Sequence, residues 1–181
     1  MATAIKQINL NNGQRAERKL LVTVAEWEEP LEGTTGTESV RELLGVRTED
    51  SSIEYNPDIQ ESTDILGNNY TDVNKTQPSQ GFDPFLILGG SRLGAFLNDI
   101  RRRNALSELQ QFTIYIITAF VGNETDGYET EKHTDCSITY DSIGGDANVN
   151  FPITVHFSNK ITTGSVDKVA ADFTFTPDAN V

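Results

Sequence analysis

The sequence contains little of what many small proteins use for covalent stability or membrane contact. Among its 181 residues there is one cysteine, Cys136, so no disulfide can form within the chain. No run approaches the roughly 18 apolar residues of a membrane-spanning helix, and the N-terminus has no apolar signal-peptide segment. We therefore expect a protein that is made in the cytoplasm, contacts no membrane and needs no oxidising compartment.

Basic residues are also scarce. Lysine and arginine total 14 against 27 aspartates and glutamates, and the formal net charge is −13. Such a surface repels nucleic-acid phosphates at long range and offers no large cationic face, which argues against a sequence-reading DNA-binding protein. The apolar fraction of 36% is low for a compact globule. It predicts polar loops or arms that become ordered only against a partner.

Catalytic and metal-binding motifs are missing. His133 and His156 have no second histidine or cysteine at metal-ligand spacing, so we interpret both as solvated or interface residues. Cys136 alternates with Ile138 and Tyr140, which favours a small buried side chain over a nucleophile. Neither a P-loop nor a Gly-x-Ser-x-Gly elbow is present. We expect no cofactor, no metal and no enzymatic activity.

What the sequence does contain is period-two alternation, the pattern of β-strands. It is clearest where Val149, Phe151, Ile153, Val155 and Phe157 share one face. Turn residues separate the candidate strands, which favours antiparallel pairing. The expected strands cover residues 19–25, 52–56, 79–87, 112–121, 129–140, 149–157 and 173–176.

One segment, at about 91–104, has helical spacing. Ser91 can cap its N-terminus, and an apolar stripe follows at i, i+3, i+4 and i+7. The fold class we predict is mainly β: an antiparallel β-sandwich or partly open barrel with this one flanking helix. We expect a single domain over 1–181, with an N-terminal arm at about 1–17 and long polar loops at about 26–50 and 58–78.

A longer pattern begins at Leu43-Leu44-Gly45-Val46 and continues with residues 50–57, which contain Ile-Glu-Tyr-Asn-Pro. It then includes residues 61–67, Thr71-Asp72-Val73 and the arginine-rich helix. Together with the later strands and the Phe173-to-Pro177 ending, it resembles the major tail tube proteins of long-tailed bacteriophages. The resemblance covers most of the chain and is weakest over residues 1–40.

This resemblance implies a structural subunit. Six copies would form a ring with a continuous inner β-barrel, and stacked rings would form a hollow tube that carries the genome into the host. The partners would be other copies, the tape measure, tail terminator and distal tail proteins, and double-stranded DNA that passes without specific binding. The protein would be assembled in the host bacterial cytoplasm and reside in the virion tail.

The arm and the two loops would contact neighbouring subunits, with a basic run facing acidic segments. By alternation, Glu54 is the candidate for a lumenal side chain. The candidate interface residues are Arg101, Arg102, Arg103, Asp58, Glu61, Asp64 and Asp72.

Three other interpretations remain open. The chain could form the tube of a contractile phage-like particle or bacteriocin, whose sheath is a separate protein. It could be a virion-associated carbohydrate-binding β-sandwich, which would need exposed aromatic residues beyond the single Trp27. It could be a glycosidase that uses two carboxylates, for instance from the acidic cluster at Glu26, Glu28 and Glu29.

Overall fold

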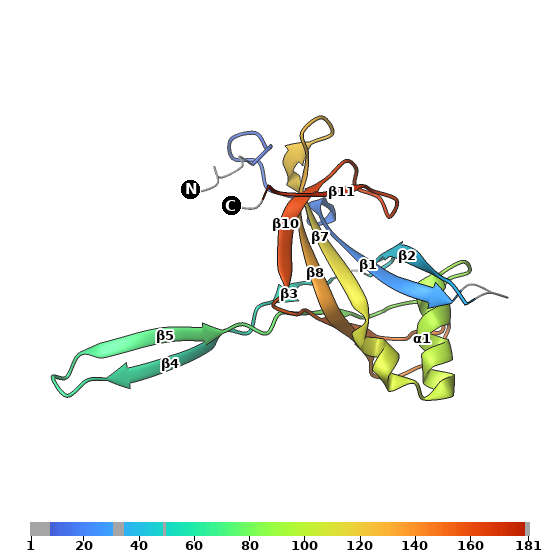
Figure 1. Ribbon diagram of the computed structural model, residues 1–181, viewed down its shortest axis with the longest axis horizontal. Helices are drawn as coiled ribbons and strands as arrows, with labels where there is room; N and C mark the ends of the chain where they lie inside the picture. The colour runs from blue at the N-terminus through green and yellow to red at the C-terminus, as the bar shows by residue number, and fades with distance from the viewer. Residues whose placement is uncertain (1–7, 31–34, 49, 180–181) are drawn as a thin grey trace.

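The protein is mainly β, with antiparallel strands and one α-helix, in a computed structural model that describes residues 8–30, 35–48 and 50–179 (Figure 1). The early elements are η1 (Arg18–Leu20), β1 (Leu21–Pro30), β2 (Thr37–Leu43), β3 (Ile53–Glu54), β4 (Asp58–Thr63), β5 (Asn69–Lys75) and β6 (Ser79–Phe82). The later elements are α1 (Arg92–Arg103), η2 (Leu106–Gln110), β7 (Phe112–Asn123), β8 (Gly127–Tyr140), β9 (Ile153–His156), β10 (Ile161–Val166) and β11 (Phe175–Pro177).

One large sheet has the strand order β2-β1-β7-β8-β9-β6-β3. The long strand β8 organises it, because its first half pairs with β10 and its second half pairs with β9. Within the described residues β2 and β3 lie at the two ends of this order and do not pair with each other. The sheet therefore curls without closing, and the prediction of a mainly β, antiparallel fold with one flanking helix is confirmed.

Helix α1 forms where its sequence predicts it. The Ser91 hydroxyl accepts a hydrogen bond from the Gly94 amide at 3.1 Å, and Asn104 ends the helix in the left-handed conformation, with φ of 55°. The predicted stripe faces the main core, where Leu93, Leu97 and Ile100 are fully buried. This face joins α1 to the inner side of the curled sheet.

A second, smaller core lies on the other side of β1 and β7. Val24, Tyr115, Ile117 and Val166 pack there under the C-terminal segment that carries Phe173. The rings of Tyr115 and Phe173 meet edge-on with centroids 4.8 Å apart. Burial raises the pKa of Tyr115 to about 12.

The predicted loop at 26–50 is wrong over most of its described length. Residues 26–30 continue β1, residues 37–43 form β2, and the two strands pair through Trp27 and Val40, both buried. The strand was not recognised in the sequence because the inward-facing Trp27 stands between two acidic residues, Glu26 and Glu28, so that the segment reads as an acidic loop. Residues 31–34 and 49 lie outside the described residues.

The predicted loop at 58–78 also contains strands, since β4 and β5 form a hairpin within it. Sequence reasoning missed β10 because its Ile-Thr-Thr-Gly-Ser-Val sequence has no strong apolar alternation. The N-terminal arm is irregular over the described residues 8–17, and Ile8 forms an isolated bridge with Val121. The first seven residues of the predicted arm lie outside the described part of the chain.

Candidate functional site

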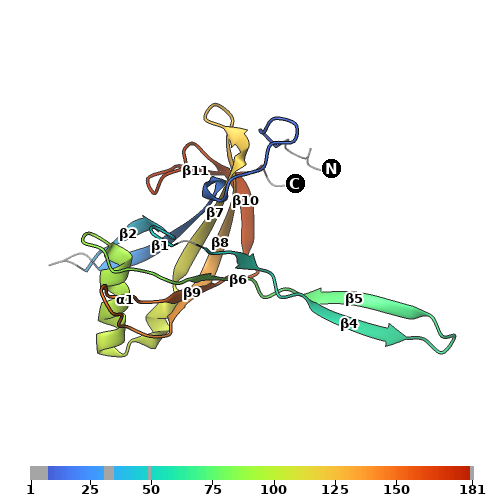
Figure 2. The ribbon, with the colours of Figure 1, turned by 180° about the vertical axis from the view of Figure 1, so that it is seen from behind.

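The β4–β5 hairpin is the most unusual feature of the molecule. It forms a two-stranded sheet of its own and projects away from the rest of the protein, as both views show (Figures 1 and 2). An isolated two-stranded hairpin is at best marginally stable in water without a further layer of packing. This geometry indicates that the hairpin is built to contact something outside its own chain.

Apolar side chains of the hairpin face solvent. The tip carries Ile65 and Leu66, which are 102% and 80% exposed. Along the stem, Ile59 and Val73 lie directly opposite each other and are 55% and 64% exposed. Large apolar side chains that gather on an exposed, projecting element indicate an interaction surface.

Asp64 organises the turn at the hairpin tip. Its carboxylate accepts hydrogen bonds from the Asn68 side chain and backbone amides at 2.9 Å each, from the Leu66 amide at 2.8 Å and from the Tyr70 hydroxyl at 3.0 Å. These donors, led by Asn68, lower the pKa of Asp64 to about 2. The structure thus gives this predicted interface residue a role in holding the turn.

The other acidic candidates of the hairpin are exposed. The side chains of Asp58, Glu61 and Asp72 make no hydrogen bond or ion pair with the described residues. Cross-strand register separates two of them: Glu61 shares a face with the Ile59–Val73 pair, and Asp72 lies on the opposite face. The acidic residues therefore do not form a single cluster, which spacing in the sequence could not reveal.

The three arginines at the end of α1 differ in their partners within the described residues. Arg103 binds Asp99 at 2.6 Å and donates two hydrogen bonds of 2.8 Å to Glu108, which raises the pKa of Arg103 and lowers that of Glu108. This arginine joins α1 to η2. Of the three predicted interface arginines, it is therefore the one with carboxylate partners among the described residues.

Arg101 and Arg102 remain available at the C-terminal end of α1. Arg101 donates to the neutral Asn98 side chain at 2.9 Å, and the exposed Arg102 makes no side-chain bond within the described residues. Glu54, the lumenal candidate, is exposed on β3 opposite Ser79. Its place in an assembly remains a prediction.

Four of the five acidic residues of β1 and β2 are, in contrast, engaged, and Glu28 is the exception among the described residues. Glu26 pairs with Arg41, and Arg92 binds Glu29 at 2.6 Å. The Glu42 carboxylate accepts bonds from the Ser91 hydroxyl at 2.7 Å and the Leu93 amide at 2.9 Å, at the positive end of the helix dipole. The Glu29 and Glu42 carboxylates therefore hold α1 against the sheet, whereas the Glu26–Arg41 pair joins β1 to β2.

Trp27, the single tryptophan, is buried. Only 2% of it is exposed, and its ring stacks on Phe96 with centroids 5.9 Å apart. It therefore cannot offer a flat, exposed platform to a sugar ring. The carbohydrate-binding interpretation therefore loses the tryptophan, although Tyr55 and Tyr70 are exposed.

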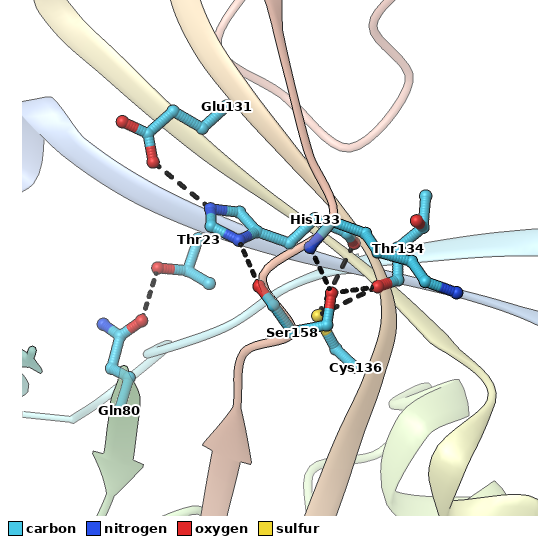
Figure 3. Close-up of polar contacts among 8 residues, drawn as sticks. Thr23, Gln80, Glu131, His133, Thr134, Cys136 and Ser158 are labelled. Carbon is cyan, nitrogen blue, oxygen red and sulfur yellow. Dashed lines mark hydrogen bonds and ion pairs between the residues drawn. The ribbon is translucent and has the colours of Figure 1, made fainter. Parts of the chain in front are cut away.

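His133 is buried, so its interpretation as a solvated or interface residue is wrong. Figure 3 shows its ring between the Ser158 carbonyl and the Glu131 carboxylate, with contacts of 3.4 and 3.2 Å. The cause is a β-bulge: Phe112 faces Cys136 while Ile114 faces His133, which places one extra residue on β8. Asp135 adopts a positive φ of 57° there. His133 and Cys136 are three positions apart and would point to opposite faces of a regular strand, but the bulge lets both side chains point inward.

Cys136 is buried as predicted. Its thiol donates to the His133 carbonyl at 3.6 Å, and burial raises its pKa, which disfavours the reactive thiolate. Nearby, the Thr23 hydroxyl donates to the Gln80 side-chain oxygen at 2.9 Å (Figure 3). Within the described residues no buried side-chain nitrogen or oxygen lacks a partner. His156 is exposed, as its interpretation required, and bonds the Thr139 hydroxyl at 3.0 Å.

Among the described residues no group of three or more histidines, cysteines or carboxylates is arranged to hold a metal ion. No helix in the same residues is long and apolar enough to cross a membrane.

The chain matches no protein-family model and no curated protein. It is similar to solved structures of particle components. One is the tube-terminating cap of the anti-feeding prophage, at 17% identity and a TM-score of 0.49 over 91% of this chain and 99% of that one. Another is from the sheath–tube complex of the PVC extracellular contractile injection system, at 15% identity and a TM-score of 0.45 over 85% and 94%.

A third is from the baseplate of the anti-feeding prophage, at 10% identity and a TM-score of 0.46 over 88% of this chain and all of that one. By their titles, these neighbours come from a tube-terminating cap, a baseplate and a sheath–tube complex. All three TM-scores are below 0.5, so the likeness carries no argument about the function of this chain.

Proposed function

We propose that this chain is a structural subunit that self-assembles into hexameric rings, which stack into the hollow tube of a phage-tail-like particle. The observation that carries the proposal is the β4–β5 hairpin, which exposes Ile65 and Leu66 at the end of a projecting arm. An unsupported hairpin with an apolar tip costs free energy in a monomer and is stabilised when a neighbour covers it. Assembly supplies that neighbour.

The charge of the chain suits a conduit. Six copies of a chain with net charge −13 carry 6 × −13 = −78. A lumen that shares this charge repels DNA phosphates, so double-stranded DNA passes without being held. Glu54 is the proposed lumenal contributor, because it is exposed on an edge strand.

The proposed tube would also need partners. We propose the tape measure, tail terminator and distal tail proteins as the partners at its inside and its two ends, and the virion tail as its final location, after assembly in the host bacterial cytoplasm. The same subunit geometry serves a contractile or a non-contractile tail, because a sheath would be a separate protein.

Negative-stain electron microscopy of the purified protein tests the proposal. We expect rings or tubes of uniform width at high concentration. The variant Ile65→Ser/Leu66→Ser should keep the β-type circular dichroism spectrum and lose these assemblies, because both side chains are exposed in the monomer. A wild-type protein that stays monomeric, even with other tail components present, would contradict the proposal.

A further inference from the structure

Two surfaces at opposite ends of the molecule carry charges that the chain itself does not neutralise. The β4–β5 hairpin lies at one end of the long axis and α1 at the other, in both views (Figures 1 and 2). Within one molecule the two surfaces cannot meet. Each is therefore left either to solvent or to another molecule.

The first surface is at the C-terminal end of α1. Arg101 and Arg102 are exposed there and have no carboxylate partner among the described residues. Leu106, at the start of η2, is 54% exposed two residues after the helix cap. We name Arg101, Arg102 and Leu106 the helix-end patch. It combines two guanidinium groups with one apolar side chain.

The second surface is one face of the hairpin. Register places Ile59, Glu61 and Val73 on the same face, all exposed. Residues 58–75 contain four carboxylates and one lysine, a net charge of 1 − 4 = −3. We name Ile59, Glu61 and Val73 the hairpin face. Like the helix-end patch, it combines apolar and charged side chains. Its carboxylate is opposite in charge to the two guanidinium groups of that patch.

We propose that the hairpin face of one copy binds the helix-end patch of a second copy of this chain. The inference rests on the proposed self-assembly and names the acceptor surface for the hairpin. Glu61 approaches the guanidinium groups of Arg101 and Arg102, and Ile59 and Val73 cover Leu106. Charge complementarity of this kind fixes orientation and register between partners.

The pairing has a geometric consequence. Donor and acceptor are different surfaces, so the contact is heterologous, and each copy can give its hairpin to one neighbour and accept one from another. When the donor and the acceptor of each copy bind different neighbours, a contact of this type closes into a ring or propagates as a stack. A reciprocal exchange of hairpins between two copies would instead close a two-fold dimer, which electron microscopy distinguishes from rings and stacks.

Charge reversal in the full-length chain tests the pairing. Glu61→Lys and Arg102→Glu should each weaken self-association at least about tenfold, because a like-charge contact replaces an attractive one. The double variant, whose net charge is unchanged, should recover most of the loss. Sedimentation velocity and electron microscopy would measure association, and circular dichroism would confirm that each variant folds.

The chain offers matched controls. Asp72→Lys makes the same charge change as Glu61→Lys on the opposite hairpin face. Arg47→Glu makes the same charge change as Arg102→Glu at an exposed arginine outside the helix-end patch. Asp72→Lys should weaken association less than Glu61→Lys, and Asp72→Lys combined with Arg102→Glu should not recover it. Arg47→Glu should have a smaller effect than Arg102→Glu.

The outcomes separate the two proposals. If Ile65→Ser/Leu66→Ser abolishes assembly while Glu61→Lys and Arg102→Glu assemble as wild type, the hairpin binds a different surface or protein, and only the pairing is overturned. Equal recovery with Asp72→Lys and Glu61→Lys also overturns it. A wild type that forms no oligomer up to about 1 mM, where even weak specific contacts are populated, contradicts both proposals.

Discussion

The β1–β2 ribbon and the β4–β5 hairpin are two antiparallel pairs built from similarly polar, acidic sequence, and they are used in opposite ways. In β1–β2 the carboxylates of Glu26 and Glu29 bind arginines, and Trp27 is buried against the helix side of the core. In β4–β5 the carboxylate of Glu61 has no partner in the described residues, and Ile59 faces solvent.

The difference shows what decides the fate of a polar strand. The β1–β2 ribbon has a layer to pack on, since α1 and the curled sheet cover its inner face. The hairpin has none, because it lies outside both cores. The first region therefore stabilises the monomer, and the second adds little to its folding and remains available to a partner. Substitutions in the two regions should separate these roles.

The largest effect should come from the main core. Leu97→Ala should lower the free energy of unfolding by about 2–5 kcal/mol, because Leu97 is fully buried in α1 and the substitution leaves a cavity. Urea denaturation followed by circular dichroism would measure it. The matched change Ile65→Ala, at the hairpin tip, should change this free energy by less than about 0.5 kcal/mol. If both variants lost a similar amount of unfolding free energy, the hairpin would contribute to the stability of the monomer as the core does.

A smaller effect should follow from uncapping α1. Ser91→Ala should cost about 1 kcal/mol, because the hydroxyl accepts from the Gly94 amide and donates to Glu42. The same denaturation measurement applies. As a control, Ser62→Ala on the exposed hairpin should have no measurable effect on unfolding. If Ser91→Ala left stability unchanged, the attachment of the helix to β2 would not depend on this cap.

The arginine run provides a test within three residues. Arg103→Gln should lower the thermal unfolding midpoint slightly, because it removes the contacts with Asp99 and Glu108. Arg102→Gln should leave the midpoint unchanged, because its side chain has no partner in the described residues. Differential scanning calorimetry of both variants would measure this. A lower midpoint for Arg102→Gln than for Arg103→Gln would contradict the assignment of Arg103 as the stabilising residue.

The most local effect concerns the hairpin tip and pH. The pKa of Asp64 is about 2, below its ordinary value of 3.8, so its bonds are fully present above pH about 4 and are lost as the pH falls through about 2. In NMR titrations the Leu66 and Asn68 amide resonances should move with a midpoint near pH 2. A midpoint near 4 would contradict the hydrogen bonds assigned to Asp64, and Asp64→Asn should abolish the transition.

Sequence patterns predicted those elements whose local signals agree with their tertiary environment. The helix predicted at 91–104 has its cap, its apolar stripe and its stop, and in the structure α1 covers Arg92–Arg103. The alternation from Val149 to Phe157 predicted five inward side chains. The four from Phe151 to Phe157 are buried, whereas Val149, which lies before β9 begins, is 50% exposed. Prediction failed where charge hid alternation, in β1–β2, and where a bulge shifted it, at His133.

For the candidate site, the sequence alone identified the segment and the residues, but not which of these side chains have partners within the chain. It identified 58–78 as a polar, acidic segment and Arg101–Arg103 as the basic run, since composition and spacing are local properties. It could not separate Asp64, which holds a turn, from Glu61, which is free, because that depends on which donors the turn brings near. Nor could it separate Arg103 from Arg102, because η2 supplies Glu108.

The sequence by itself therefore determined an acidic, disulfide-free, mainly β chain with one capped helix, because charge, cysteine count and periodicity do not depend on long-range packing. Only the tertiary structure decided which charges are neutralised within the chain. Ion pairs such as Arg92 with Glu29 join residues 63 positions apart, and the pairing of strands brings them together. The same pairing left the β4–β5 hairpin without a covering layer, and so made it the surface available to a partner.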